Sequence, residues 1–482
     1  MDTQRADNLS CYGYLKKTTP NIDVIAREGV LFANNIIPGI WTLSCHASLF
    51  TGRYVSCHGA DAHHEFLPVD FPTMAEILGK LGYRTVGLSN NGWVSRSSGI
   101  ARGFDEFYLI GKGREKTKKV EWFYVEEESI EEEQDRGSLK TVDAAIGWME
   151  KKHSGEQPFF MFINVIEPHG PYWPPEPFRG AFLPPGVDGE EAESIPPLRS
   201  VEECIDIRVG KLNLTSREWS IQKALYDGCT ATVDDRIGRL YKYLETKGIL
   251  DDTIFIVTSD HGDVRDEHPP HVEHHLCAYD ELIRVPLIMR YPKVLPKGKR
   301  VRWITQTLDI LPTILDILDV SNEMLQKTLQ GYSVLPAIDN EPCREFALTE
   351  YMKPLQQFFL IWRRHPDFDI GTYNYMLKAL RTLEYKYIWY SNGKAELFDL
   401  NNDPSEKENL AKDMPDKVLE MKTKMENFLM SMDRVDYGDW LNVGRRIVRM
   451  PGAEEVFRRL KTWGLYRETK QAQTPQEKDT YI

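Results

Sequence analysis

The strongest constraint on the fold of this chain is a repeated order of short β-rich runs, each followed by a polar loop and then by a helical pattern. Such an order predicts parallel strands in an α/β sheet. The clearest runs are residues 83–91, 158–169, 253–262 and 285–292. In open α/β sheets the ligand site lies beyond the carboxyl ends of the strands. The polar residues predicted at that edge are Asn90, Asn91, Glu167, His169, Asp260 and His261.

The character of the chain changes after about residue 340. Residues 385–404 alternate aromatic and polar side chains around an Asn-Gly pair, which predicts an antiparallel hairpin. We therefore expect an α/β/α sandwich on a mostly parallel sheet, followed by a smaller α+β subdomain. The expected parts are a catalytic domain over 1–340, an antiparallel-sheet subdomain over 341–430, and a helical extension with a polar tail over 431–482.

Charge and cysteine content exclude several classes of partner. Lys plus Arg total 60 and Asp plus Glu total 73, so the formal charge is −13 and no general field attracts nucleic acid or anionic lipid. No uncharged apolar run approaches the roughly 18 residues that a membrane helix needs. Seven scattered cysteines without a CxxC pair favour free thiols in a reducing compartment. We expect a cytoplasmic protein with a small anionic substrate and neither nucleic acid nor membrane as partner.

Two segments carry the residue types that catalysis needs. Asp260 and His261 end an apolar strand, and carboxylate oxygen with neutral imidazole nitrogen suits a divalent cation. Five of the 12 histidines lie between residues 261 and 275, although an exposed polar loop is the alternative. Residues 41–52 offer several hydroxyls just before a helical run, where free backbone N–H groups can hold a tetrahedral oxyanion. The alternative is that these hydroxyls only cap the helix.

Several motifs, in the same order along nearly the whole chain, resemble the sulfatase branch of the alkaline phosphatase superfamily. They include DTQRADNLSCYGY at 2–14, TLSCHASLFTGRYVSCHG at 42–59, EPHGPY at 167–172, TSDHGD at 258–263, YDELIRVPLI at 279–288 and LFDLNNDPSEKENLA at 397–411. The resemblance implies the alkaline phosphatase/sulfatase-like sandwich. It also implies a metal-dependent hydrolase that cleaves a small anionic ester.

The resemblance implies one divalent ion, Mn, Mg, Ca or Zn, at a site completed by the nucleophile. The matching ligands are Asp2, Asp260, His261 and the nucleophile Thr42. His169 matches a histidine that faces the leaving group or the substrate oxyanion. His274 or His275 matches an anion-binding or general-acid position, and the sequence leaves open which of the two acts. Substrate contacts are expected from His46, Asn90 and Asn91, although turn formation explains either asparagine equally well.

The nucleophile position departs from the pattern of true sulfatases. Those enzymes carry Cys or Ser within C/S-x-P-x-R and convert it to formylglycine, whereas this chain has Thr42, with Ser44 at the proline and His46 at the arginine position. We therefore expect no formylglycine. Threonine nucleophiles occur in the phosphodiesterase, phosphonate-hydrolase and phosphotransferase branches. The resemblance thus favours a metal-bound Thr42 that attacks a phosphodiester or phosphonate over one that attacks a sulfate ester.

Three alternatives remain open at this point. The chain could be an arylsulfatase-like sulfuric ester hydrolase proper, a catalytically weak member that serves as a binding protein, or a transferase to an acceptor alcohol. Asp2 raises a separate question, because a ligand at the end of a central strand needs about five or six strand residues before it. Either the true start lies upstream, which we expect, or a central slot of the sheet is open. The sequence allows an oligomer but does not predict one.

Overall fold

The computed structural model describes residues 1–62, 64–110, 135–153, 155–195, 201–352 and 355–432. The predicted helical extension and tail lie, from residue 433 onward, outside the described residues. Among the described helices none is both long and apolar enough to cross a bilayer. All seven cysteines fall within the described ranges, and none of them forms a disulfide.

The described strands form three sheets. Their bounds are β1 Val30–Ile36, β2 Arg84–Ser89, β3 Glu106–Leu109, β4 Phe159–Asn164, β5 Phe255–Thr258, β6 Leu287–Arg290, β7 Lys299–Gln306, β8 Ala347–Tyr351, β9 Leu377–Arg381, β10 Tyr385–Tyr390 and β11 Ala395–Asp399. The first sheet is parallel, in the order β3-β2-β4. The second has the order β5-β6-β1-β7, with β6 antiparallel to both neighbours and β7 parallel to β1. The third is an antiparallel meander, β11-β10-β9-β8.

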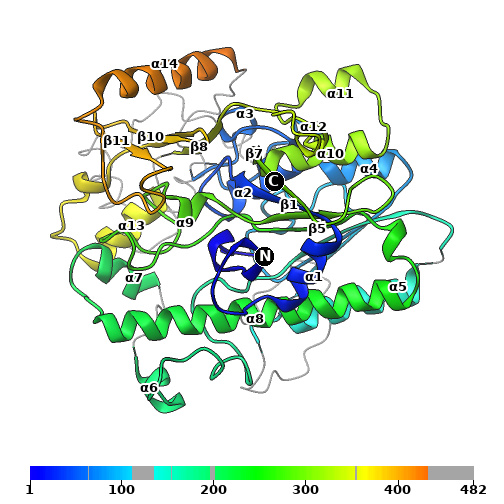
Figure 1. Cartoon of the computed structure of the whole chain (residues 1–482), viewed down its shortest axis with the longest axis horizontal. Helices are drawn as coiled ribbons and strands as arrows, with labels where there is room; N and C mark the ends of the chain where they lie inside the picture. The colour runs from blue at the N-terminus through cyan, green and yellow to red at the C-terminus, as the bar shows by residue number, and fades with distance from the viewer. Residues whose placement is uncertain (63, 111–134, 154, 196–200, 353–354, 433–482) are drawn as a thin grey trace, which may run out of the picture.

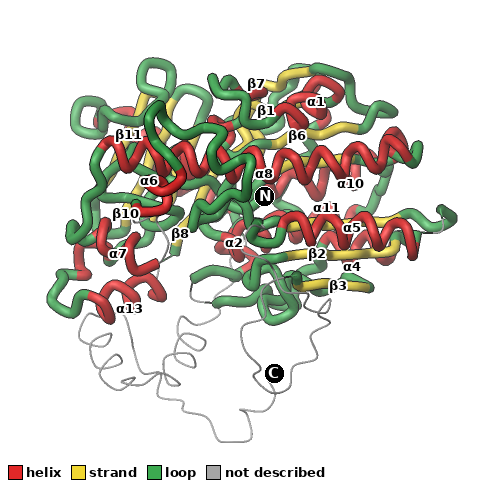
Figure 2. The backbone as a smooth tube through the Cα atoms, turned by 90° about the horizontal axis from the view of Figure 1, so that it is seen from below, coloured by secondary structure: helices red, strands yellow, loops and turns green. Residues whose placement is uncertain are grey.

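Helices cover the first two sheets on both faces. The described helices are α1 Pro20–Glu28, α2 Thr42–Thr51, α3 Val55–His58, α4 Met74–Lys80, α5 Ser138–Lys152, α6 Gly189–Ser194, α7 Val201–Arg208, α8 Ser216–Thr246, α9 Asp280–Ile283, α10 Ile310–Ile317, α11 Glu323–Thr328, α12 Leu335–Ile338, α13 Leu355–Arg364 and α14 Pro415–Ser431. Figure 1 shows α1, α5 and α8 below β1 and β5, and α4 and α10 above them. In Figure 2, α5 runs alongside α8. The two layers enclose separate apolar cores, one on each face of the strands.

The predicted α/β/α sandwich is confirmed. All four β-rich runs form strands, namely β2, β4, β5 and β6. The prediction that the run at 285–292 is parallel is wrong, because β6 is antiparallel to β5 and β1. The connection between β5 and β6 contains only the one-turn helix α9 and no crossover helix, so the chain re-enters the sheet from the edge that it has just left.

The C-terminal sheet carries the predicted hairpin, formed by β10 and β11. Its apolar face packs against α14 in a cluster that includes Leu380, Tyr387, Leu397, Met421 and Met425. Figure 1 shows α14 beside β10 and β11, away from α5 and the right-hand end of α8. The boundary near residue 340 stays a prediction, although β8 begins the separate sheet at Ala347.

The N-terminus lies between the first two sheets. Met1 N donates to Thr258 O at 3.1 Å, and Asp260 N donates to Met1 O at 3.3 Å, which is the pattern of a parallel pair. On the other side Asp2 N donates to Val165 O at 3.0 Å. Figure 1 accordingly shows the N-terminus in the middle of the molecule. Asp2 is therefore fixed where β4 and β5 end.

Candidate metal centre and nucleophile

Three ligand groups from distant parts of the chain converge at the carboxyl edge of the sheets. One ligand atom each from Asp2, Asp260 and His261 lies within 4.8 Å of the others, and all three residues are buried. His261 Nε2 is 3.7 Å from Asp2 Oδ1 and 3.5 Å from Asp260 Oδ2. These are the sequence-predicted metal ligands, and the fold brings them together.

The two carboxylates each leave one oxygen without a partner. Asp2 Oδ1 and Asp260 Oδ2 are buried and accept no hydrogen bond from the part of the chain that the structure describes. Their second oxygens do accept, from Asn91 Nδ2 and from the backbone N–H of His261 respectively. Burial, and after it the charge of Asp260, raises the pKa of Asp2. Unpartnered buried carboxylate oxygens are costly unless a cation compensates them, so this donor set fits a divalent metal ion.

His261 is held in the tautomer that metal binding needs. Its Nδ1 lies 3.0 Å from Gly262 O. A carbonyl oxygen can only accept, so Nδ1 carries the proton and Nε2 keeps its lone pair, directed at the carboxylates. Two carboxylate oxygens and one neutral imidazole nitrogen suit Zn, Mn or Mg-like ions. Asp2, Asp260 and His261 would hold such an ion.

Asn91 orients the Asp2 carboxylate. Asn91 Nδ2 donates to Asp2 Oδ2, while its Oδ1 accepts from Trp93 N at 2.8 Å. Both polar atoms of the amide therefore bond the protein, and Asn91 holds the carboxylate of a candidate metal ligand. The substrate contact of Asn91 stays a prediction. Asn90 Oδ1 accepts from Ile166 N at 2.6 Å and shapes the loop after β4, and the substrate contact of Asn90 stays a prediction.

The turn after Asp2 is anchored to α8. Thr3 has a φ of 61°, a left-handed conformation that is strained for a β-branched residue. The fully buried Tyr226 hydroxyl donates to Thr3 O at 2.7 Å and accepts from Arg5 N at 3.0 Å. Thr3 N also donates to Asp260 Oδ1 at 3.2 Å. Sequence reasoning missed Tyr226, because a tyrosine inside a long helix looks like any other core position.

Thr42 is the first residue of α2, and its hydroxyl faces the metal ligands. Thr42 Oγ1 lies 3.3 Å from His261 Nε2, and the residue is 3% exposed. The N-cap residue, Trp41, makes no side-chain cap bond, so capping does not explain the hydroxyls of this segment. The other hydroxyls bond within the protein: Ser44 to Trp41 O, Ser48 to His58 Nε2, and Thr51 to Ala47 O.

His274 and His275, between which the sequence did not choose, point in different directions. The His274 ring stacks on His261, with ring centroids 4.4 Å apart, and meets the edge of His169 at 5.1 Å. His275 Nδ1 instead lies 3.0 Å from the Tyr351 hydroxyl. His274 is therefore the histidine beside the candidate metal centre. Two other histidines of the cluster, His268 and His271, pack near Tyr279 instead.

Burial keeps His169 and His274 neutral at neutral pH. It lowers the pKa of His169 to about 4, with Arg136 adding to the effect, and it lowers the pKa of His274 well below its usual range. His169 Nδ1 lies 2.6 Å from Gly170 O and so carries the proton. Its Nε2 is consequently an acceptor at neutral pH.

His46 supports the nucleophile from the same helix. Its Nδ1 lies 2.7 Å from Thr42 O and 3.7 Å from Asp260 Oδ2, and the residue is 4% exposed. Its ring meets the edge of Phe162 on β4. The Nδ1 proton of His46 is used by the Thr42 carbonyl, and the ring packs between α2 and β4. The substrate contact of His46 stays a prediction.

Two family models and several sulfatases are similar to this chain in sequence. The family model described as Sulfatase matches residues 1–320, and the model described as N-sulphoglucosamine sulphohydrolase, C-terminal, matches residues 274–434. Arylsulfatase K of Xenopus laevis is 23% identical over 454 residues, which cover 85% of this chain and 77% of that protein. N-acetylglucosamine-6-O-sulfatase of Bacteroides thetaiotaomicron is 24% identical over 477 residues, covering 85% and 81% respectively.

Solved structures share the fold. A protein solved in complex with its substrate D-glucosamine-2-N,6-O-disulfate superposes with a TM-score of 0.69 at 23% identity, covering 89% of this chain and 95% of that one. The phosphonate monoester hydrolase of Agrobacterium radiobacter gives a TM-score of 0.67 at 22% identity, with 88% and 93% coverage. At these identities the likeness establishes the architecture, and the chemistry has to be argued from the site.

Proposed function

Because this chain belongs to the sulfatase family of the alkaline phosphatase superfamily and is a hydrolase of sulfate or phosphate esters, we propose that it cleaves small phosphodiesters or phosphonate esters with Thr42 as nucleophile. The observation that carries the proposal is the position of the Thr42 hydroxyl, 3.3 Å from His261 Nε2 at the first turn of α2. The relatives include proteins named as sulfatases, and a structural neighbour is named as a phosphonate monoester hydrolase. The comparisons therefore leave the choice between a sulfate and a phosphonate substrate open.

The identity of the nucleophile favours phosphorus. Formylglycine is an aldehyde made from the primary side-chain carbon of Cys or Ser, whereas the corresponding carbon of Thr42 carries a methyl group and would give a ketone. A formylglycine hydrate can expel sulfate through its second hydroxyl. A threonine ester has no second hydroxyl, so water must attack the phosphorus or sulfur atom to release the product.

The proposed reaction has two displacement steps. In the first, the Thr42 oxygen forms a bond to phosphorus, the bond from phosphorus to the leaving oxygen breaks, and the hydroxyl proton ends on the leaving alcohol. In the second, water attacks phosphorus, the bond to Thr42 breaks, and the hydroxyl is restored. A divalent ion held by Asp2, Asp260 and His261 would lower the pKa of the Thr42 hydroxyl and draw charge from the transferring group.

The residues around Thr42 suit both steps. The N-terminal N–H groups of α2 and its helix dipole can bind the oxyanion that develops on the transferring group. His169 Nε2 is an acceptor at neutral pH, so it can take a proton from the attacking group and pass it to the leaving oxygen. We propose His169 and His274 for this proton transfer. His46 holds the main chain of Thr42.

The decisive experiment assays aryl phosphodiester, phosphonate, phosphomonoester and sulfate substrates with Mn, Mg, Ca or Zn. We expect phosphodiester or phosphonate turnover that a chelator abolishes. Thr42→Val keeps the side-chain shape without the hydroxyl and should lower kcat/KM by about 10³-fold or more. Thr51→Val is the matched control, since it makes the same change at the far end of α2, where the hydroxyl bonds Ala47 O. Its kcat/KM should change by less than about threefold.

Mass spectrometry of the quenched reaction tests the covalent step directly. A phosphoryl adduct is expected on the peptide that contains Thr42, and it should be absent from Thr42→Val. Turnover of sulfate esters alone would instead identify a sulfuric ester hydrolase. Turnover no higher than that of Thr42→Val on every substrate and metal would refute catalysis by this hydroxyl and support a binding protein.

A further inference from the structure

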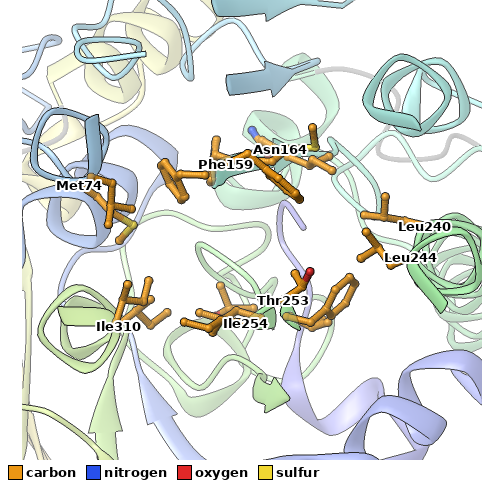
Figure 3. A pocket seen from close by; sticks show the side chains of 18 of the residues that line it. Met74, Phe159, Asn164, Leu240, Leu244, Thr253, Ile254 and Ile310 are labelled. Carbon is orange, nitrogen blue, oxygen red and sulfur yellow. The ribbon is translucent and has the colours of Figure 1, made fainter. Parts of the chain in front are cut away.

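The loop that follows β4 carries His169, and it lies just beyond a groove between β4 and β5. The groove has a volume of about 690 Å³, and Figure 3 shows Phe159 and Asn164 of β4 on one side of it. Residues 166–170 do not line the groove. The loop is therefore held by direct contacts with the rest of the protein, and these contacts decide where the His169 side chain lies.

One residue, Arg136, bonds this loop through both its main chain and its side chain. Arg136 N donates to Glu167 Oε1 at 2.7 Å. Arg136 Nη1 donates to Gly170 O at 2.7 Å and also to His169 O. Two successive carbonyl groups are thus held by one guanidinium nitrogen, whose N–H bonds point in fixed directions.

Arg136 is itself fixed by the two helices next to it. The preceding residue, Asp135, accepts from Gly137 N at 3.0 Å and from Leu139 N at 3.0 Å, so it satisfies free N–H groups at the start of α5. The same carboxylate pairs with Arg236 Nε of α8 at 3.0 Å. Arg136 is therefore placed by α5 and α8, and the loop with His169 is held against them.

The Gly170 carbonyl that Arg136 holds is also the one that the His169 ring uses. His169 Nδ1 donates to Gly170 O at 2.6 Å, so this oxygen accepts from the imidazole and from the guanidinium. On another side the ring meets His274, with ring centroids 5.1 Å apart. Fixing the oxygen therefore fixes the direction of the imidazole and of the lone pair on its Nε2.

The charge of Arg136 acts on the same imidazole. Burial lowers the pKa of His169 to about 4, and the positive charge of Arg136 is the next cause. His261 lowers the pKa further, and Asp260 opposes these effects. A histidine with a low pKa is a strong acid once it is protonated, which suits a group that returns a proton to a leaving oxygen.

We propose that Arg136 is a positioning residue for His169: by holding the His169 and Gly170 carbonyls, it directs the imidazole toward the leaving oxygen of the ester. The part of the proposal that concerns catalysis rests on the proposed function of His169. The part that concerns the ring direction does not. Glu167, which the sequence placed at the edge of the sheet, belongs to the same arrangement through the main-chain N–H of Arg136.

Hydrogen exchange of the His169 ring tests the ring direction without any substrate. A ring N–H that donates to a buried carbonyl exchanges slowly and gives its own signal in ¹H–¹⁵N spectra of the chain labelled with ¹⁵N-histidine and supplied with Mg²⁺. The His169 signal is the one absent from His169→Asn. In Arg136→Gln this N–H should exchange about tenfold faster or more, while the ring N–H groups of His46 and His261 should keep their rates.

Arg136→Lys keeps the charge without the planar guanidinium, and its His169 N–H should exchange at an intermediate rate. This variant replaces Arg136→Gln if the latter does not fold. An unchanged rate at His169 in both variants would overturn the proposal. An equal acceleration at His46 and His261 would overturn it too, because Arg136 would then support the whole centre and not this ring.

A comparison of two leaving groups tests the consequence for catalysis. Phenyl methylphosphonate needs a proton on its leaving oxygen, whereas 2,4-dinitrophenolate leaves as an anion. Arg136→Gln should lower kcat about 10²-fold for the phenyl ester and less than about threefold for the dinitrophenyl ester, with KM nearly unchanged. In a His169→Ala background it should change kcat by less than about threefold. Arg84→Gln, which breaks a pair with Glu106 away from the site, is the matched control and should leave both rates unchanged.

Equal losses with both esters would overturn the positioning role, and so would equal losses with and without His169. If the unsubstituted chain cleaves neither ester, the proposed function fails. The exchange rate of the His169 N–H then still decides whether Arg136 holds the ring.

Discussion

The central sheets and the C-terminal sheet differ in how completely their strands are covered. In the C-terminal sheet Leu380, Ile388 and Leu397 are 0% exposed. β4 instead borders a groove of about 690 Å³. At about 24 cal/mol per Å³ such a space, sealed and empty, would cost about 17 kcal/mol, more than the roughly 5–15 kcal/mol net stability of a domain. The groove is therefore not a sealed and empty cavity. Both regions have apolar cores, but, among the strands that the structure describes, only in the central region do two edges, those of β4 and β5, border such a groove.

The largest expected effect lies at the junction of the two regions. Lys386 of β10 is 0% exposed, and its Nζ lies 3.0 Å from Asp280 Oδ1 of α9 and bonds Glu406. Lys386→Met would leave buried carboxylates without this cation, and we expect a loss of about 3–5 kcal/mol in the free energy of unfolding. Urea denaturation measures it. Lys386→Arg keeps the charge and should lose clearly less; equal losses would mean that side-chain fit, and not charge, joins the regions.

Matched core truncations should sharpen the contrast. Leu380→Ala on β9 should cost about 2–5 kcal/mol, because a side chain packed on all sides leaves a cavity. Ile163→Ala on β4 should cost about 1 kcal/mol, because part of its surface already faces the groove. Both values come from urea denaturation of the full chain. A cost for Ile163→Ala as large as that for Leu380→Ala would show that the groove side is packed in solution.

The helical layers over the two regions should differ in pH dependence. α8 holds α1 through Asp234, whose carboxylate accepts from Ile22 N at 2.8 Å and from Asn21 N at 3.1 Å. Burial raises the pKa of Asp234 to about 6, above the ordinary value of about 3.9. The folded state then binds this proton more tightly than the unfolded state. The contribution of Asp234 to the free energy of unfolding is largest below about pH 4, and it declines by about 2–3 kcal/mol as the pH rises through 6.

Asp234→Asn does not titrate, so it isolates this contribution. The quantity to follow is the offset of the variant, meaning its difference in free energy of unfolding from the unsubstituted chain, whatever that offset is at pH 4. Between pH 4 and pH 7 the offset should shift by about 2–3 kcal/mol in favour of the variant. α14 covers the C-terminal sheet with apolar residues such as Met425, so Met425→Leu is the control and its offset should not vary with pH. Urea unfolding at several pH values gives both curves. A constant offset for Asp234→Asn would contradict the raised pKa.

The smallest effect concerns metal affinity, which only the central region should control. Asn91→Ala removes the hydrogen bond to Asp2 Oδ2, and we expect Mn²⁺ to bind about 10–100-fold more weakly. Isothermal titration calorimetry measures the Kd. Leu380→Ala, titrated at a temperature where it is folded, should leave the Kd unchanged. An unaltered Kd in Asn91→Ala would mean that the turn at Thr3, which Tyr226 anchors to α8, orients Asp2 without the hydrogen bond from Asn91.

Sequence patterns predicted the strands because burial imposes them locally. Apolar runs bounded by polar residues mark β2, β4 and β5 correctly, and the change of period after residue 340 marks the hairpin of β10 and β11. Strand direction is not encoded in this way, since the apolar run of β6 reads the same in either direction. The supporting roles of Asn91, His46 and Tyr226 had no sequence signal, because they depend on which atoms meet across elements far apart in the chain.

By itself, the sequence determined the α/β class, because short-range periodicity is a local property, and the family likeness, from which the site residues Asp2, Thr42, Asp260 and His261 were predicted. Only the tertiary structure decided which oxygens of the carboxylates remain unpartnered, that the His274 ring stacks on His261, and that a groove separates β4 from β5. The physical reason is that the site is assembled by contacts between segments more than 200 residues apart, such as Thr42 with His261 and Thr3 with Asp260, whose relative positions are set by the packing of the whole sheet.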